Sequence, residues 1–547
     1  MGLNFQWSRL KLAVLSAIAL GTHIAIATPV KAAETIIVRQ GIMSLSLAIE
    51  DLEILANTGK APPGLRGYEL FLSAQQKQQV LAAFNSQIGI PPTAVRNLLT
   101  TQIGENILDE IATITRTQDP QTRGADIKTA LLEAAESESG LSILGFLQSY
   151  PNPELRIDID VAFDVFSRLN RSFWRTQQFM VEIVQQLGPT DANLTLPLDP
   201  TQPGPHQVIT TTHTFEDTAR NRTIDVDIYW SEAVTSDRPV VLFTHGRGSV
   251  RNELQYVARH LASHGYAFVT LEHPGSNQTY ISQNLAMQPQ ELLERPQDIS
   301  FVLDQLTQLT QTGGVIERSL NPNRVLVIGY SLGGGTALTI AGGEFQLDSL
   351  RQRCQQDAIT LSSGQITQCI ATELPGDRYR LYDPRIKAAI ALNPTASLIF
   401  GETGLTQIRV PTLIFSTSAD KLTPALSDQI AIFPQIPAPK WLVGVLGGTH
   451  LSAKDPDFVL DQSRVPSTPL SGDEVAGLAA ADIQNYVKAF TLAMAAQLTP
   501  EAEKYQIFLT PEYFEFISTD AFPVRLLTEI PEPMQILVDS FLKDQLP

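Results

Sequence analysis

The sequence predicts an α/β fold, with a mostly parallel sheet and helices on both faces, preceded by a mainly helical N-terminal domain. After about residue 205, short apolar runs typical of buried strands alternate with segments of helical periodicity. One such run, Val325–Ile328, leads directly into Gly-Tyr-Ser-Leu-Gly at 329–333 and then into a helix rich in small residues. Because 547 residues exceed the size of one ordinary core, we expect two domains.

The predicted sheet begins with a hairpin. Thr210–Phe215 and Thr223–Trp230 alternate between apolar and polar residues, as two strands joined by a polar turn do. Further strands are expected at 239–244, 267–271, 324–328, 386–392, 412–415 and 441–445. Helices are expected at about 253–264, 296–310, after residue 331 and at about 474–497. Residues 344–384 do not fit this alternation and are expected to form a cap inserted after the helix that follows Ser331.

The N-terminal half has three expected parts. Residues 1–32 resemble a signal peptide: Arg9 and Lys11 precede an apolar stretch, and small residues at 30 and 32 suit cleavage before Ala33. An uncleaved N-terminal anchor is the alternative, and either reading places the protein outside the cytoplasm, as periplasmic, secreted or anchored. Residues 33–190 form the mainly helical domain, which contains no histidine or cysteine. Residues 191–205 are expected to be a linker, and 206–547 the catalytic domain.

Composition narrows the classes of partner. The net charge of −18 argues against nucleic acid or an anionic lipid surface as the main partner, because like charges repel. Only Cys354 and Cys369 are present. In an oxidising compartment we expect a disulfide between them, with two free thiols as the alternative. No histidine lies near them to complete a coordination shell, so we do not expect a zinc site there.

Ser331 is the candidate nucleophile. A strand that turns sharply into a helix at Gly-x-Ser-x-Gly is the form of a nucleophile elbow, in which only glycine fits two residues either side of the serine. The alternative is a glycine-rich turn without chemistry. The strand before the motif and the small-residue helix after it favour the catalytic interpretation.

A serine hydroxyl needs a base, and the base needs a carboxylate that orients it. After Ser331 the chain has one histidine, His450, which follows the expected strand at 441–445. Asp420 follows the strand at 412–415 at a suitable distance, so we expect the triad Ser331, Asp420 and His450. Asn393 ends the preceding strand and cannot serve as the acid. The other aspartates weighed for this role fit less well: Asp357, Asp377, Asp383 and Asp428.

Two backbone N–H groups are expected to form the oxyanion hole. Leu332 begins the helix after the nucleophile, and Arg247 lies between two glycines in the turn that follows the strand at 239–244. His245 and His273 also lie at strand ends. We expect His245 to brace the turn and His273 to line the pocket rather than to act as bases.

Three stretches carry a family resemblance: 242–248 with 261–266, 295–304, and 329–335. They resemble platelet-activating-factor acetylhydrolases and their bacterial relatives, including proteins described as dienelactone-hydrolase-like. The resemblance covers about residues 205–460, and the N-terminal part is similar to the helical domain attached to such hydrolases in cyanobacteria. It implies an α/β-hydrolase fold and the same triad without metal or organic cofactor. True dienelactone hydrolases use a cysteine nucleophile where this chain has Ser331.

The function expected is a serine hydrolase that cleaves carboxylic esters with short-chain or lipid-like acyl groups through an acyl-enzyme. Phospholipid deacylation of the platelet-activating-factor type and thioester cleavage are the alternatives within this class. A non-catalytic binding protein on the same scaffold is the alternative from another class. Expected partners are small-molecule or lipid esters, with peripheral membrane contact and oligomeric state left open. The N-terminal domain is expected to give structural support, while a lid, a membrane contact and a recruitment role stay open.

Overall fold

A computed structural model describes residues 33–40, 43–66, 87–88, 102–115, 123–137, 141–158, 194–283, 285–314, 317–355, 361–457 and 474–543, with a few isolated positions between 92 and 180. These residues fall into two compact units, one containing 33–161 and the other 175–543. The predicted signal peptide, residues 1–32, lies outside the described residues. Among the helices that are described, none is both long enough and apolar enough to cross a bilayer.

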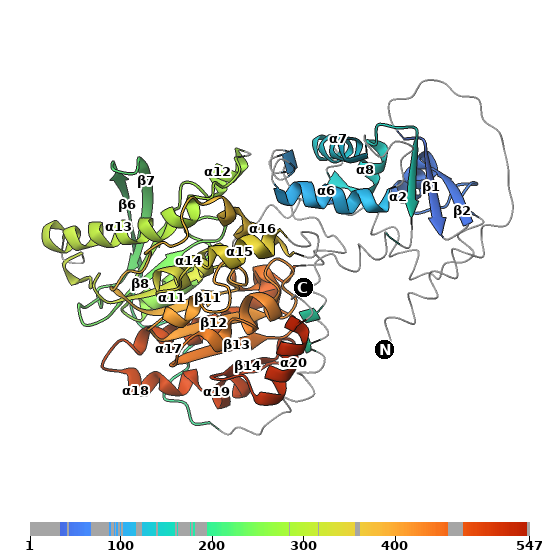
Figure 1. Cartoon of the computed structure of the whole chain (residues 1–547). Coiled ribbons are helices and arrows are strands. Elements are labelled where there is room, and N and C mark those ends of the chain that lie inside the picture. The colour runs from blue at the N-terminus through green and yellow to red at the C-terminus, as the bar shows by residue number, and fades with distance from the viewer. Residues whose placement is uncertain are drawn as a thin grey trace. The chain divides into compact units, whose positions relative to one another are not determined.

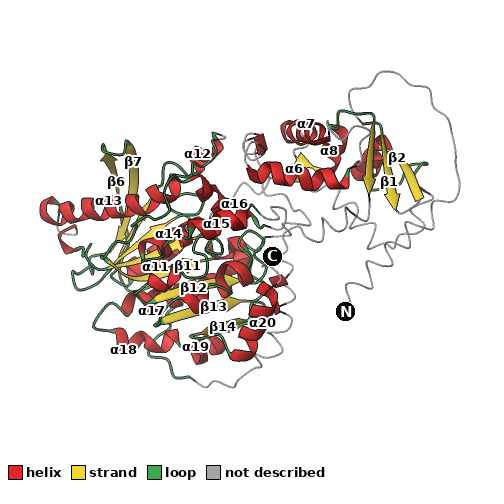
Figure 2. Cartoon of the chain, viewed as in Figure 1, coloured by secondary structure: helices red, strands yellow, loops and turns green. Residues whose placement is uncertain are grey.

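The second unit is built on a nine-stranded sheet (Figures 1 and 2). In spatial order its strands are β14 (Val524–Leu527), β13 (Lys440–Val445), β12 (Thr412–Thr417), β11 (Ile386–Leu392), β10 (Val325–Tyr330), β8 (Val240–Thr244), β9 (Ala267–Leu271), β7 (Arg222–Trp230) and β6 (Ile209–Asp217). The strands from β13 to β9 run parallel, whereas β14 at one edge and β7 and β6 at the other pair antiparallel. This confirms the predicted α/β fold.

The central strands are buried on both faces, which explains their continuous apolar sequences. Every residue of β8, β9 and β10 is buried. Alternate residues such as Phe243, Ile328 and Phe415 join one large core cluster with residues from α11 (Gln255–Ser263) and α17 (Ala481–Ala496). On the opposite side, α13 (Glu291–Thr312) packs against α14 (Leu332–Ile340), and α14 contacts β10 and β11.

The remaining helices of this unit are short: α12 (Gln278–Ser282), α15 (Leu347–Cys354), α16 (Ser363–Cys369), α18 (Ala502–Tyr505), α19 (Pro511–Phe516) and α20 (Glu532–Lys543). Single turns occur at Glu317–Ser319, Ile370–Glu373, Gly404–Gln407, Leu426–Ile430, Phe433–Gln435, His450–Ala453, Gly477–Ala480 and Gln506–Leu509. Helices α15 and α16 occupy the expected cap, and Cys354 and Cys369 are joined by a disulfide there.

Three details differ from the sequence prediction. Helix α13 begins at Glu291, five residues before Pro296, which lies inside it. Proline is favoured in the first turn of a helix, so Pro296 indicated a start that lies five residues after the observed one. The helix expected at about 474–497 is α17, which begins at Ala481 and follows the single turn at Gly477–Ala480. Finally, β14 adds an edge strand of four residues that the sequence analysis did not identify.

The first unit combines a small sheet with helices. Its sheet has the order β2 (Met43–Ala48), β1 (Thr35–Gln40), β5 (Glu154–Asp158), and a second pair is formed by β3 (Gln87–Ile88) and β4 (Leu141–Ser142). Its helices are α2 (Ile49–Thr58), α6 (Gln102–Ile114), α7 (Arg123–Glu136) and α8 (Ile143–Gln148). Apolar residues from both kinds of element form its own core, among them Ile36, Leu52, Ile127 and Leu155.

Several residues before β6 belong to the second unit. Thr176 is fully buried, and its hydroxyl accepts a hydrogen bond from the Leu426 backbone N–H at 3.2 Å. Phe179 is also fully buried. Within the segment expected to be a linker, Leu194, Leu196 and Leu198 pack against the large core cluster. These described residues before β6 are therefore packed on the second unit and do not form an extended linker.

Candidate active site

Ser331 lies in the turn between β10 and α14, with φ 55° and ψ −117°. A non-glycine residue with this positive φ is strained, as expected where a strand turns sharply into a helix. A Cβ atom added at Gly329 would lie 1.9 Å from the Gly333 carbonyl oxygen, and one at Gly333 would lie 2.0 Å from the Thr244 carbonyl oxygen. The two glycines of the motif are thus required by close backbone approach, as the elbow interpretation predicts.

The structure brings Ser331, His450 and Asp420 together from three separate strand ends. The Nε2 atom of His450 lies 3.0 Å from Ser331 Oγ, and Nδ1 lies 2.6 Å from Asp420 Oδ2. Asp420 is fully buried and His450 is 4% exposed. With Nδ1–H donating to the carboxylate, Nε2 is left to accept the serine proton.

Four protein donors besides His450 hold the Asp420 carboxylate. The backbone N–H groups of Leu422 and Thr423 donate to Oδ1 at 2.9 and 2.8 Å. The Thr423 hydroxyl and the Asn393 amide donate to Oδ2 at 2.7 and 2.8 Å. Both oxygens of the carboxylate are thus held in place by protein donors. The sequence analysis missed both supporting side chains, although the position of Asn393 at the end of β11, beside β12, was a usable signal.

Two backbone N–H groups near Ser331 have no acceptor among the described residues: those of Arg247 and Leu332. Leu332 is the first residue of α14, where the helix dipole favours negative charge. Arg247 follows Gly246, where an added Cβ would lie 3.4 Å from the Ser331 Cβ. The turn at His245–Ser249, hereafter the oxyanion turn after the role predicted for it, therefore lies directly beside Ser331.

His245 and His273 are fully buried, and one hydrogen bond joins them directly. The Nε2 atom of His245 accepts the His273 backbone N–H at 3.0 Å, and its Nδ1 lies 2.7 Å from the Gly246 carbonyl oxygen. Burial lowers the pKa of both imidazoles well below the ordinary value, with the Arg295 guanidinium adding to the effect. Both rings are therefore neutral and contribute to the shape of the turn.

One cluster contains enough potential metal ligands to be considered. Within the described residues, His273, Glu291 and Asp298 place ligand atoms within 4.8 Å of one another. However, Arg222 pairs with Glu291 at 3.0 Å and with Asp298 at 2.6 Å, and His273 Nδ1 lies 2.9 Å from Asp298. Since these groups already satisfy one another, the cluster is better described as a buried ion-pair network than as a metal site.

The segment expected to form a cap, residues 344–384, contacts the loop that contains Asp420. The Gly364 N–H at the start of α16 donates to the Leu422 carbonyl oxygen at 2.8 Å. The disulfide between Cys354 and Cys369 joins α15 to the end of this helix, across 15 residues of sequence. A backbone hydrogen bond thus joins this segment directly to the Asp420 loop.

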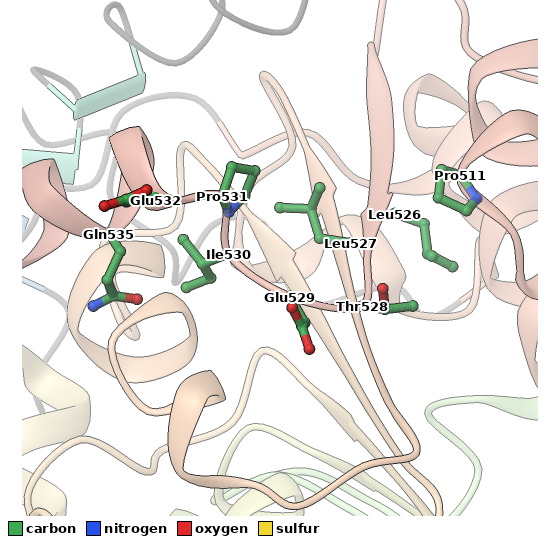
Figure 3. Close-up of a pocket in the computed structure, with 9 residues that line it drawn as sticks. All are labelled: Pro511, Leu526, Leu527, Thr528, Glu529, Ile530, Pro531, Glu532 and Gln535. Carbon is green, nitrogen blue, oxygen red and sulfur yellow. The ribbon is translucent and has the colours of Figure 1, made fainter.

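A hollow of ≈570 Å³ lies elsewhere, beside the edge strand β14 (Figure 3). Its lining contains no histidine, serine or cysteine, and none of Ser331, Asp420 and His450 belongs to it. Its lining residues are Pro511, Leu526, Leu527, Thr528, Glu529, Ile530, Pro531, Glu532 and Gln535.

Comparisons with known families agree with this architecture. Residues 215–462 match the family described as platelet-activating factor acetylhydrolase, isoform II. Residues 32–158 match a family described as an α/β-hydrolase of unknown function, DUF1400. No curated protein matches the chain. The mostly parallel sheet and these two matches show an α/β-hydrolase fold, and residues 215–462 are similar to the isoform II platelet-activating factor acetylhydrolases.

Proposed function

We propose that this hydrolase cleaves carboxylic esters through an acyl-enzyme on Ser331. The observation that carries the proposal is the hydrogen-bonded row from Asp420 through His450 to Ser331, with lengths of 2.6 and 3.0 Å. These lengths are within the range that direct proton transfer needs. A row of this kind is what converts a weakly nucleophilic hydroxyl into an attacking group.

The proposed reaction has two steps. As Ser331 Oγ attacks the ester carbonyl, its proton moves to His450 Nε2 and then to the departing alcohol. Water then attacks the acyl carbonyl and gives a proton to the same nitrogen. His450 returns that proton to Ser331 Oγ as the bond from Oγ to the acyl carbon breaks, and the acid is released. Asp420 keeps the imidazole in the required tautomer throughout. The N–H groups of Leu332 and Arg247 stabilise the oxyanion, and one such donor typically contributes about 3 kcal/mol to transition-state stabilisation.

The proposed substrates are esters with short-chain or lipid-like acyl groups. The match to the isoform II acetylhydrolases favours deacylation of short-acyl phospholipids as a second candidate within the same mechanism. We also propose that the protein is exported, because the Cys354–Cys369 disulfide suits an oxidising compartment.

The first test compares the wild type with Ser331→Ala on p-nitrophenyl esters of increasing chain length and on short-acyl phospholipids. Loss of hydrolysis by a variant with unchanged thermal stability would support the proposal. Retained turnover would refute the assignment of Ser331. The second test is labelling with a fluorophosphonate, which should modify Ser331. A stably folded wild type that neither hydrolyses esters nor reacts with the label would favour a non-catalytic binding role.

A further inference from the structure

The oxyanion turn is held by a buried carboxylate that the reaction itself does not use. Glu253 is fully buried, and its Oε1 atom accepts the Gly246 backbone N–H at 2.6 Å. Its other oxygen, Oε2, accepts a short hydrogen bond from the Ser249 hydroxyl. The Glu253 side chain thus accepts hydrogen bonds from residues of the turn on both sides of Arg247.

The cation that pairs with this carboxylate comes from the loop that carries the base. Lys454 Nζ lies 2.9 Å from Glu253 Oε2 and 3.4 Å from Ser249 Oγ. The Lys454 side chain is 10% exposed and that of Glu253 is fully buried. In addition, the Asp455 backbone N–H donates to the Glu253 carbonyl oxygen at 2.8 Å. The two segments are 201 residues apart in sequence and meet only through folding.

The same lysine is close to the support of the catalytic histidine. Its Nζ lies over the Tyr330 ring, 5.2 Å from the centroid, and the Tyr330 hydroxyl donates a short hydrogen bond to the His450 carbonyl oxygen. Tyr330 itself directly precedes Ser331. The ammonium group, which the histidine loop itself carries, therefore contacts both the oxyanion turn and the nucleophile strand.

A buried ion pair is a costly way to gain stability. The desolvation of both charges usually cancels their attraction, and apolar residues of similar size often serve as well. What such a pair gives instead is a fixed geometry, since each charge can be satisfied only in one arrangement. Here the pair joins the turn that contains Arg247 to the loop that contains His450.

We propose that Glu253 and Lys454 are positioning residues whose ion pair locks the oxyanion turn to the histidine loop, so that both act on the same carbonyl group. This inference rests on the proposed function. A displacement of about 1 Å between these parts is expected to slow the chemical step about 100-fold. Substrate binding, which does not depend on oxyanion alignment, should change little.

The test uses Glu253→Gln, Lys454→Met and the double variant, with a p-nitrophenyl ester that the wild type hydrolyses. Each single variant leaves an unpaired buried group and should be less stable, and the double variant should recover part of that stability. If the pair positions the turn, the double variant should still show kcat reduced about tenfold or more, with KM changed less than about threefold. A double variant with wild-type kcat would overturn the inference and leave the pair a structural role only.

A matched control is the pair Asp383–Arg385, 2.6 Å apart, which precedes β11 at the opposite end of the parallel strands. The variant Asp383→Asn/Arg385→Met should change stability without the fall in kcat. Hydrogen exchange gives a measurement that needs no substrate. Amides of residues 246–249 should exchange faster in the Glu253→Gln/Lys454→Met variant than in the wild type, and equal exchange would overturn the inference. If the wild type hydrolyses no ester, the proposed function fails while the exchange result still decides the positioning role.

Discussion

Replacing Gly333 with alanine tests how tightly the nucleophile elbow is packed. The new Cβ would lie 2.0 Å from the Thr244 carbonyl oxygen and 2.7 Å from the His245 carbonyl oxygen. Real Cβ atoms essentially never come closer than 3.0 Å to such neighbours, so the two backbones must separate by at least about 1 Å. The atoms in the way are backbone atoms and cannot rotate aside.

The two backbones that must move apart are those of α14, which contains the Leu332 N–H, and of the oxyanion turn, which contains the Arg247 N–H. We therefore expect Gly333→Ala to lower kcat on a p-nitrophenyl ester about 100-fold, because both donors and the nucleophile lose alignment. Overpacking should lower the free energy of unfolding by about 1–3 kcal/mol. Steady-state kinetics and urea denaturation measure the two effects separately.

The matched control is Gly444→Ala in β13, where an added Cβ meets no atom within 4 Å. Its free energy of unfolding should stay within about 0.5 kcal/mol of the wild type, with unchanged kinetics. A Gly333→Ala enzyme with wild-type kcat would show that the elbow is looser than described, and the reasoning about its glycines would be wrong.

Three further predictions concern separate features. Asn393→Gly keeps the positive φ of 44° but removes one donor to Asp420, so kcat should fall about tenfold. The free energy of unfolding should fall by about 1–3 kcal/mol, because the lost amide is buried and also donates to Thr417, and equal kcat would mean that this amide does not support the acid. Burial raises the pKa of Asp428 from 3.8 to about 6, so the folded state binds this proton more tightly than the unfolded state. Lowering the pH from 7 to 5 should therefore stabilise the wild type by about 1 kcal/mol relative to Asp428→Asn in urea titrations, and parallel pH profiles would contradict this. Replacing Cys354 and Cys369 with serine should lower the free energy of unfolding by about 3 kcal/mol, and treating the wild type with reductant should have the same effect. A serine variant as stable as the oxidised protein would show that the disulfide does not contribute to stability.

Much of the catalytic unit could be predicted because its signals are local. The strands are buried on both faces, so each is a continuous apolar run such as Val325–Ile328. Ser331 follows its strand within a five-residue motif, and His450 is the single histidine after it. Chain order and strand ends were sufficient to select the three residues that the structure brings together.

The parts that could not be predicted depend on contacts between distant segments. Asn393 and Thr423 meet Asp420 only where the ends of β11 and β12 lie side by side. Glu253 and Lys454 have no periodic or spacing signal that relates them. The edge strand β14 has only four residues and pairs with β13 alone, so its sequence pattern was too short to identify.

The buried residues ahead of the sheet determine where the chain can be cut. A shortened protein starting at residue 206 would lack Thr176, leaving the Leu426 amide without its acceptor, and would uncover the apolar surface beneath Leu194 and Leu196. Expression of the hydrolase part by itself should therefore begin before Arg175. Loss of activity on truncation at 206 is therefore no evidence for a lid by itself, because the same cut removes residues that pack on the catalytic unit.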